Sequence, residues 1–219
     1  MALSAKRRAR RLAIAVLAVT LPLAPSIVRA AEAPGVPAEV LRGKAYYTTC
    51  AGCHGNAGEG FRGMRAPGLA GMPQAYVERQ LQLFRSGQRG GPADFYGVAM
   101  NGRAKALPSD QAVRDVAAYI ATLPRPAAAA AAGDHRRGRE LYASCSSCHG
   151  ERAEGNTGVG APPLRGLAPW YLEAQLRNFK TGVRGKEGDG PGLQMRAAAA
   201  AIPDEAAMHD LSEYLASLP

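Results

Sequence analysis

The sequence has few large aromatic side chains. Among its 219 residues are 4 Phe, 8 Tyr and 1 Trp, which is little material for building the core of even a small domain. No stretch of useful length alternates apolar and polar residues with a period of two, as half-buried strands do. The chain also has no spare thiol, because its four cysteines fall into two short motifs. These absences predict an all-α protein whose cores are completed by something other than side chains.

Both cysteine motifs have the form Cys-x-x-Cys-His. They are Cys50-Ala51-Gly52-Cys53-His54 and Cys145-Ser146-Ser147-Cys148-His149. This spacing lets two sulfurs reach the two vinyl groups on one edge of a porphyrin while the next residue, histidine, turns under the ring to ligate iron. We therefore predict two haem c groups, attached through Cys50/Cys53 and Cys145/Cys148, with His54 and His149 as proximal iron ligands. A covalently held porphyrin would also supply the missing core.

Three other interpretations of the cysteines fit the sequence less well. A zinc site would need the two pairs closer together, typically about 15–20 residues apart, whereas 91 residues separate Cys53 from Cys145. A thioredoxin-type pair needs a βαβ context and gains nothing from the histidine. A structural disulfide is the simplest alternative for an exported protein. The histidine recurring at equivalent positions favours haem over all three.

The second half of the sequence repeats the first with an offset of 95 residues. Comparing residues 41–124 with 136–219 without a gap gives 34 identities in 84 positions. A repeat of this strength indicates a duplicated domain. Arg125-Pro126 and six alanines break the composition as a linker does. The predicted boundaries are 31–124 for the first domain, 125–133 for the linker and 134–219 for the second domain.

The repeat also selects the second iron ligand. Apart from the initiator, only Met100 and Met195 correspond to each other among the methionines, each 46 residues beyond the motif histidine. Two His/Met haems are predicted, with His54 and Met100 on one iron and His149 and Met195 on the other. The remaining methionines and histidines have no equivalents and are assigned to core packing or to the surface: Met64, Met72, Met208, His135 and His209.

The amino end is typical of a secretory signal peptide. Basic residues at positions 6–11 precede an apolar run, and Val28-Arg29-Ala30 offers small residues for cleavage. The run contains Pro22 and Pro25 and is shorter than the about 20 residues that span a bilayer, so a retained anchor is the weaker alternative. We expect residues 1–30 to be removed near Ala30 and the mature chain, without a transmembrane segment, to reach the periplasm.

Removing this segment changes the charge. Residues 1–30 hold six of the 27 basic residues and none of the 18 acidic ones. The net charge of the remaining chain is therefore about +3, compared with +9 for the whole sequence. Up to four haem propionates would bring the sum near −1, which removes the main support for nucleic-acid binding. An asymmetry remains: residues 31–124 carry 10 basic and 7 acidic groups, and residues 134–219 carry 10 and 11. The halves are therefore suited to different partners.

Local signals predict several helices. Ser109 and Asp204 are typical N-caps ahead of apolar residues at helical spacing. A middle helix is expected from Pro73 to Gly87 and, in the repeat, from Pro169 to Gly182. A short helix over residues 43–49 should lead into the first motif. We expect a long loop rich in Gly and Pro to deliver Met100 or Met195 to the iron.

Around the motifs the sequence resembles the dihaem cytochrome c4 family across nearly the whole mature chain. The residues that carry the likeness are Cys-x-x-Cys-His-Gly, Ala66-Pro67-Gly68-Leu69, Tyr76 to Arg89 with Gln80, Phe84 and Gly87, a following Met, and Leu107-Pro108-Ser109-Asp110 before Tyr119. The resemblance implies two tandem class I cytochrome c domains that transfer electrons in the periplasm toward terminal oxidases. It also implies that the carbonyls of Pro67 and Pro162 hydrogen-bond the proximal imidazoles, against the alternative that these prolines only stiffen a loop.

Haem propionates need hydrogen-bond donors. The repeat narrows the candidate donors to basic positions that are present in both halves. These are Arg42/Arg137, Lys44/Arg139, Arg85/Lys180 and Arg89/Arg184. Arg89 and Arg184 keep the guanidinium, which suits a carboxylate. The alternative is a solvated charge beside a glycine turn.

Three function classes remain open. The first is an electron carrier between a respiratory donor complex and a terminal oxidase, with peripheral membrane association as an option and no enzymatic activity, because both irons would have two protein ligands. The second is the dihaem cytochrome subunit of a dehydrogenase complex, such as a flavocytochrome. The third, a dihaem peroxidase or a sulfur-compound oxidase, needs an open iron position, and the paired Met100 and Met195 argue against it.

Overall fold

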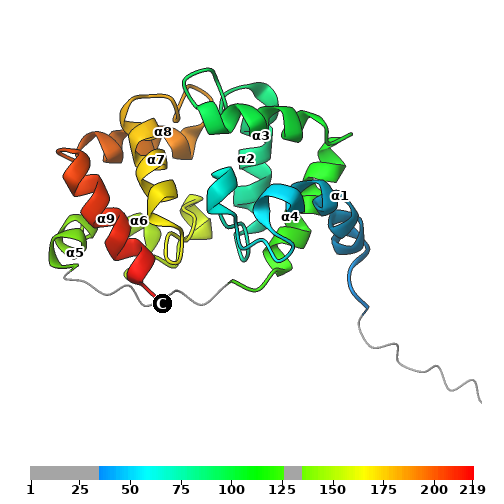
Figure 1. Ribbon diagram of the computed structural model, residues 1–219, viewed down its shortest axis with the longest axis horizontal. Coiled ribbons are helices and arrows are strands. Elements are labelled where there is room, and N and C mark those ends of the chain that lie inside the picture. Colours follow the sequence, from blue (N-terminus) through cyan, green and yellow to red (C-terminus); the bar gives the residue numbers. More distant parts are fainter. Residues whose placement is uncertain (1–34, 126–134) are drawn as a thin grey trace, which may run out of the picture. The chain divides into compact units, whose positions relative to one another are not determined.

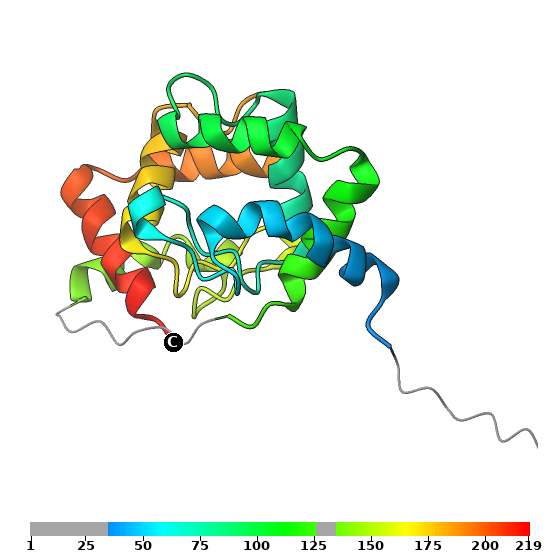
Figure 2. The same cartoon turned by 45° about the vertical axis from the view of Figure 1, so that its right-hand side comes forward.

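The computed structural model describes residues 35–125 and 135–219. Its first half contains α1 (Ala38–His54), α2 (Gln74–Ser86), α3 (Phe95–Lys105) and α4 (Asp110–Thr122), and its second half contains α5 (Arg136–Tyr142), α6 (Ser146–His149), α7 (Pro169–Lys180), α8 (Gly190–Ala200) and α9 (Glu205–Ser217). Short 3-10 turns lie at Arg62–Met64 and Thr157–Val159. Each half keeps its own group of helices in both views (Figures 1 and 2). The predicted signal peptide and nearly all of the predicted linker lie outside the described residues.

The fold is all-α, as predicted. The β pairing among the described residues consists of two isolated bridges, Phe61 with Ala66 and Asn156 with Ala161. These bridges fold back the loop that follows each cysteine motif. No helix within residues 35–125 and 135–219 combines the length and apolar character that crossing a bilayer requires.

The predicted helix starts are confirmed at the last helix of each half. The Ser109 side chain accepts a hydrogen bond from the Ala112 N–H at the start of α4, and Asp204 does the same for Ala207 at the start of α9. Such caps satisfy N–H groups that lack a partner within the helix. The middle helix also begins and ends close to the predicted residues: α2 follows Pro73 and stops at Gly87, whose φ is 79°.

Two expectations about local structure are wrong. The helix that leads into the first motif is not confined to residues 43–49, because α1 begins at Ala38 and continues through the motif to His54. Met100 and Met195 are not delivered by loops, since they lie on α3 and α8. An aspartate caps the start of each helix: the carboxylates of Asp94 and Asp189 accept a hydrogen bond from the backbone N–H three residues later, at 3.2 and 3.1 Å. These caps stabilise the helices despite the low helix propensity of the nearby glycines and prolines.

A close helix crossing organises each half. At Gly43 of α1 an added Cβ would lie 2.0 Å from the Asp115 carbonyl oxygen of α4, and at Gly138 of α5 it would lie 2.2 Å from that of Asp210 in α9. Only glycine allows backbones to approach so closely. Tilted tyrosine pairs flank the crossings, with ring centroids 5.2 Å apart for Tyr47 and Tyr119. The residues buried around them include Val113, Val116, Ile120, Leu211 and Leu215.

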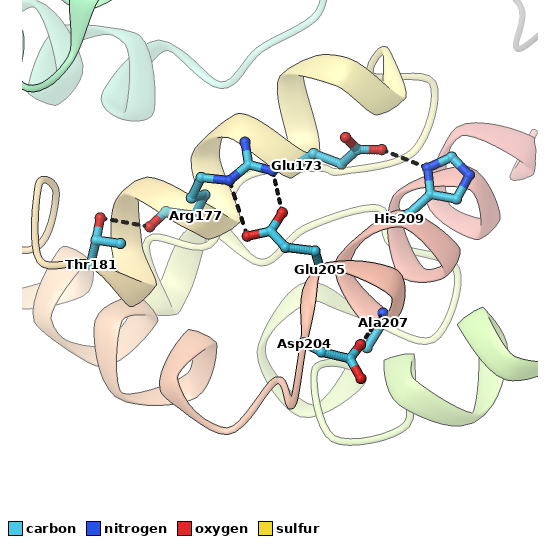
Figure 3. Close-up of polar contacts among 7 residues, drawn as sticks. All are labelled: Glu173, Arg177, Thr181, Asp204, Glu205, Ala207 and His209. Carbon is cyan, nitrogen blue, oxygen red and sulfur yellow. Dashed lines mark hydrogen bonds and ion pairs between the residues drawn. The ribbon is translucent and has the colours of Figure 1, made fainter.

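Charged contacts on the surface tie α7 to α9 in the second half. Arg177 donates to both carboxylate oxygens of Glu205, and His209 Nδ1 lies 2.8 Å from a Glu173 oxygen (Figure 3). In the first half, Arg85 of α2 pairs with Asp110 at the start of α4. These pairs are exposed and contribute little to stability. They do keep each middle helix aligned with the last helix.

Candidate functional site

The helices bury the histidine of each attachment motif, while Cys50, Cys53 and Cys145 are half-buried and Cys148 is exposed. Cys50, Cys53 and His54 lie in the last turn of α1, and α6 carries Cys148 and His149 directly after Cys145. The four thiols are free. Burial raises the pKa of the Cys50 and Cys145 thiols.

Both motif histidines are buried and oriented by a proline carbonyl. His54 Nδ1 lies 2.8 Å from the Pro67 oxygen, and His149 Nδ1 lies 2.8 Å from the Pro162 oxygen. A carbonyl can only accept, so Nδ1 carries the proton and donates it. Burial lowers the pKa of both imidazoles, against the smaller opposite effect of this hydrogen bond. Each ring is therefore neutral with Nε2 free to bind a metal, as an iron ligand must be.

In the second half the structure brings the two predicted axial ligands face to face. His149 Nε2 lies 3.4 Å from Met195 Sδ, although 46 residues separate them in sequence. One ligand ends α6 and the other lies in the middle of α8. Met100 holds the corresponding position on α3 and is half-buried. A soft thioether opposite an imidazole suits a low-spin haem iron.

A tyrosine and a glycine lock the turn that follows each histidine, and neither was identified from the sequence as part of the site. Tyr47 donates its hydroxyl proton to the Gly55 carbonyl at 2.8 Å, and Tyr142 donates to that of Gly150. Both glycines have φ above 80°, a conformation that other residues rarely adopt. Both the tyrosine and the glycine are identical in the two halves at the repeat offset. This identity was the sequence signal that could have identified them.

The other residues that the sequence did not assign are Gln80 and Gln175. Gln80 Oε1 accepts from Arg89 Nη1 at 2.7 Å and from Arg184 Nη2 at 3.0 Å. Gln175 Oε1 accepts from Arg184 Nη1 at 2.7 Å and from Arg89 Nη2 at 3.2 Å. Each arginine thus bonds one glutamine of its own half and one of the other. We call these four residues the arginine–glutamine cluster.

No carboxylate among the described residues balances the charge of this cluster. Arg89 and Arg184 are 6 % and 3 % exposed, and within residues 35–125 and 135–219 neither takes part in an ion pair. Burial, and then the positive charge of Arg89, lowers the pKa of Arg184. The Nε atoms of both arginines are buried without a hydrogen-bond partner in the described part of the chain. Buried cations with unused donors fit an anionic group, which a haem propionate would supply.

Four of the six other basic residues in the pairs that the repeat selected have other partners, and the remaining two, Lys44 and Arg139, are exposed. Arg42 binds Asp115 through two hydrogen bonds of 2.7 and 3.0 Å. Arg137 binds Asp210, and Lys180 donates to the Ile202 carbonyl oxygen. Among the basic pairs that the repeat selected, the structure therefore leaves Arg89 and Arg184 as the best suited to a carboxylate.

Comparisons with known proteins agree with this geometry. The family model for cytochrome c matches residues 40–124 and again residues 135–219. Cytochrome c4 of Azotobacter vinelandii is 32 % identical over 213 residues, which cover 91 % of this chain and 97 % of the relative. A thiosulfate dehydrogenase electron acceptor of Thiomonas intermedia is 34 % identical over 186 residues, 78 % of this chain and 79 % of the relative.

The fold also has a solved counterpart. The crystal structure of reduced recombinant cytochrome c4 from Pseudomonas stutzeri superposes with a TM-score of 0.70 at 28 % identity, over 82 % of this chain and 98 % of that one. The family match covers both halves and both cysteine motifs. The chain therefore belongs to the dihaem cytochrome c4 family, with two tandem cytochrome c domains that each hold one c-type haem and serve electron transport.

Proposed function

We propose that this protein is an electron carrier of the periplasm that takes electrons from a respiratory donor complex and passes them to a terminal oxidase, with no turnover of its own. The contact between His149 Nε2 and Met195 Sδ at 3.4 Å carries the proposal. If His149 and Met195 both bind the iron of a haem, no coordination position is left on it for a substrate. Met100 and His54, at the equivalent positions, extend the same argument to the first half.

The residues divide the task in the same way in each half. The cysteine sulfurs hold the haem, which supplies reversible one-electron chemistry when bound. The Pro67 and Pro162 carbonyls fix the tautomer and the orientation of the histidines. Arg89 and Arg184, which are both buried, would bind propionates. A site that keeps both ligands in place reorganises little when an electron arrives, which suits fast transfer.

Two assays test the proposal. The holoprotein should take up and release two electrons in a redox titration, and should restore oxygen uptake to washed membranes that contain a terminal oxidase and a quinol donor. It should show no more peroxidase or thiosulfate-oxidising activity than free haem when no partner enzyme is present. Saturable turnover of peroxide or thiosulfate by the isolated protein would contradict the proposal.

The second candidate is the electron-accepting subunit of a thiosulfate dehydrogenase. The specific observation in its favour is the relative of that name in Thiomonas intermedia, which the chain matches over 79 % of its length. The haem sites would work in the same way, and only the donor would differ. A stable complex with a thiosulfate dehydrogenase catalytic subunit, which then reduces this protein when thiosulfate is added, would favour this candidate over the respiratory carrier.

The place of action and the domain boundaries are also proposals. We propose that residues 1–30 direct export and are cleaved near Ala30, and that residues 31–124 and 134–219 form the two domains around a linker at 125–133. The intact mass of the periplasmic protein tests the first point and the haem number together. The expected mass is that of a chain beginning near Ala31 with two haems, and a longer chain or a single haem would contradict it.

A further inference from the structure

The turn that follows the first cysteine motif differs in composition from its repeat equivalent. Both turns are closed by an isolated bridge, Phe61 with Ala66 and Asn156 with Ala161. Four positions inside them differ: the first half has Phe61, Arg62, Met64 and Arg65 where the second half has Asn156, Thr157, Val159 and Gly160. Phe61 is 57 % exposed and Met64 is 54 % exposed. The first half thus exposes an aromatic ring and two cations on a turn that the second half builds without either.

The stability of the turn does not explain these residues. The Asn156 side chain accepts a hydrogen bond from the Gly158 N–H at 2.9 Å and so caps its turn, whereas Phe61 makes no side-chain cap bond. At the end of the turn Gly160 has a φ of 70° and Arg65 has a φ of 51°, a conformation that is unfavourable for a residue with a Cβ. The first turn therefore lacks two stabilising features of the second, and Phe61 and Arg65 are better explained by contacts outside the turn.

The first turn borders a groove that it shares with the start of α7. The groove has a volume of about 270 Å³ and is lined by Phe61 and Arg62 from the first half and by Trp170 from the second. The Arg65 guanidinium lies 5.8 Å from the Trp170 ring centroid and 5.5 Å from that of Tyr96, within the range of cation–π contacts. The groove thus combines aromatic rings with arginine, the residue types that dominate the binding energy of protein–protein interfaces.

The positive charge around the groove is not neutralised within the described chain. Neither Arg62 nor Arg65 forms an ion pair among residues 35–125 and 135–219. Glu59 also lines the groove, and its carboxylate accepts a hydrogen bond from the Ala57 N–H at 2.9 Å. Two cations therefore stand against one carboxylate that is already used by the backbone. Such a groove suits an apolar group that is flanked by acidic residues.

At the second turn the protein itself occupies the equivalent place. Arg79 Nη2 of α2 donates to the Gly160 carbonyl oxygen at 2.9 Å. A Cβ added at Gly160 would lie 2.8 Å from Arg79 Nη1 and 3.5 Å from Pro191. The repeat equivalent of Arg79 is Ala174, which is too short to make the same contact with the first turn. The second turn is thus closed by an arginine of the other half, and the first turn keeps its groove.

From these observations we propose that the groove lined by Phe61, Arg62 and Trp170 is the docking site for a redox partner protein, which inserts an apolar side chain flanked by acidic residues. The proposal rests on the electron-carrier function. The groove lies near an iron ligand, because Pro67, directly after the turn, accepts the hydrogen bond of His54. In each encounter one electron would pass between the redox centre of the partner and the haem of the first half, so that one is oxidised as the other is reduced.

A simpler explanation is that Phe61 and Arg62 are ordinary exposed residues, as many apolar and charged side chains are. Their replacement would then leave partner binding unchanged. The probe is a preparation of washed membranes that contain a terminal oxidase and a quinol donor. Oxygen uptake, measured as the concentration of added holoprotein rises, gives the half-saturating concentration and the maximal rate. Docking affects the first quantity, whereas damage to the haem sites affects the second.

The test compares F61N/R62T, which takes both residues from the second turn, with the matched control L193Q/R196Q on α8. Each variant removes one exposed apolar residue and one exposed arginine. At low ionic strength we expect F61N/R62T to raise the half-saturating concentration about tenfold with little change in the maximal rate, and the control to change it less than twofold. The introduced asparagine can cap the turn, so the variant should unfold at no lower denaturant concentration than wild type. R62Q alone should have a smaller effect that disappears at high salt.

The proposal is overturned if F61N/R62T and the control raise the half-saturating concentration equally, or if neither does. The wild type separates this failure from a failure of the proposed function. A wild-type holoprotein that dithionite reduces but that does not restore oxygen uptake contradicts the carrier function itself. One that restores uptake, with F61N/R62T equally effective at the same concentration, contradicts only the docking site.

Discussion

In the first half one continuous helix, α1, runs from Ala38 through the cysteine motif to His54, whereas in the second half the chain leaves α5 at Tyr142 and starts α6 at Ser146. The ion pair that supports the crossing differs as well. Asp115 has a side chain only 2 % exposed where it meets Arg42, but Asp210 is 35 % exposed where it meets Arg137. Equivalent residues thus form a half-buried pair in one half and a solvated pair in the other.

Much of what the halves share, apart from the glycine crossings and the helix caps, lies close to the haem sites. The distance from the histidine to the proline oxygen is 2.8 Å in both, both have the tyrosine contact to the glycine after the histidine, and both contribute an arginine and a glutamine to the cluster. The comparison teaches that the cofactor constrains its immediate surroundings after duplication, while supporting helices and surface charges diverge.

The largest expected effect comes from exchanging an axial ligand. Met100→His and Met195→His should each remove about half of the red charge-transfer absorption typical of Met-ligated ferric haem and lower the potential of one haem by on the order of 100 mV or more. The reason is that a thioether favours ferrous iron more than imidazole does. Near-infrared spectra and a redox titration measure both changes.

Three methionines without repeat equivalents serve as controls for that experiment. Met64→Leu, Met72→Leu and Met208→Leu should keep the absorption, because Met64 is 54 % exposed and the other two are core residues. If a control removes the band, or if either histidine variant keeps all of it, the assignment of the axial ligands is wrong and the two halves do not share their coordination.

The helix crossings should be equally sensitive in the two halves. Gly43→Ala would place a methyl carbon 2.0 Å from a backbone carbonyl oxygen, and Gly138→Ala would place one at 2.2 Å. Each change should lower the free energy of unfolding by about 3 kcal/mol. Guanidinium unfolding of the holoproteins measures it. Gly52→Ala, where an added Cβ meets nothing within 4 Å, is the control, and a loss as large as that of Gly43→Ala would show that the crossing is not the cause.

The ion pairs should distinguish the halves. Asp115→Ala removes two hydrogen bonds to Arg42 and should cost about 2 kcal/mol, whereas Asp210→Ala should cost less than about 1 kcal/mol because its pair is solvated. Arg42 holds the pKa of Asp115 below its ordinary value. The contribution of Asp115 is therefore present above the unfolded pKa and is lost as the pH falls through the lower folded value. If the two variants lose the same free energy of unfolding at neutral pH, the predicted difference between the halves is wrong.

The smallest expected effect is confined to the second half. The Glu173 carboxylate raises the pKa of His209 above its ordinary value, and the first half has Arg114 at that position. The attraction is present below the unfolded pKa of the histidine and is lost as the pH rises through its raised folded pKa. Glu173→Gln should lower the pKa of His209 in an NMR titration, and an unchanged value would assign the shift to other neighbours.

Apolar periodicity and helix caps allowed much of the fold to be predicted. Helix-end residues such as Ser109, Asp204, Pro73 and Gly87 mark a helix end through contacts within one turn of the chain, and such contacts can be recognised in the sequence. Helices α3 and α8 were missed because their glycines and prolines resemble a loop, and the Asp94 and Asp189 caps outweigh that tendency. The four motif cysteines, both histidines and both methionines were named from spacing alone. The arginine–glutamine cluster could not be predicted, since two of its four hydrogen bonds join residues 86 and 104 positions apart.

That cluster bears on how the protein matures after export. Before haem is attached, Arg89 and Arg184 would meet as two buried like charges, which opposes closure of the joint between the halves. We expect newly exported chains to remain open at the joint, with each cysteine motif accessible to the attachment apparatus, and to close only when propionates arrive. A haem-free variant with all four motif cysteines replaced by alanine should have a larger radius in solution scattering than the mature protein, and equal radii would contradict this order of assembly.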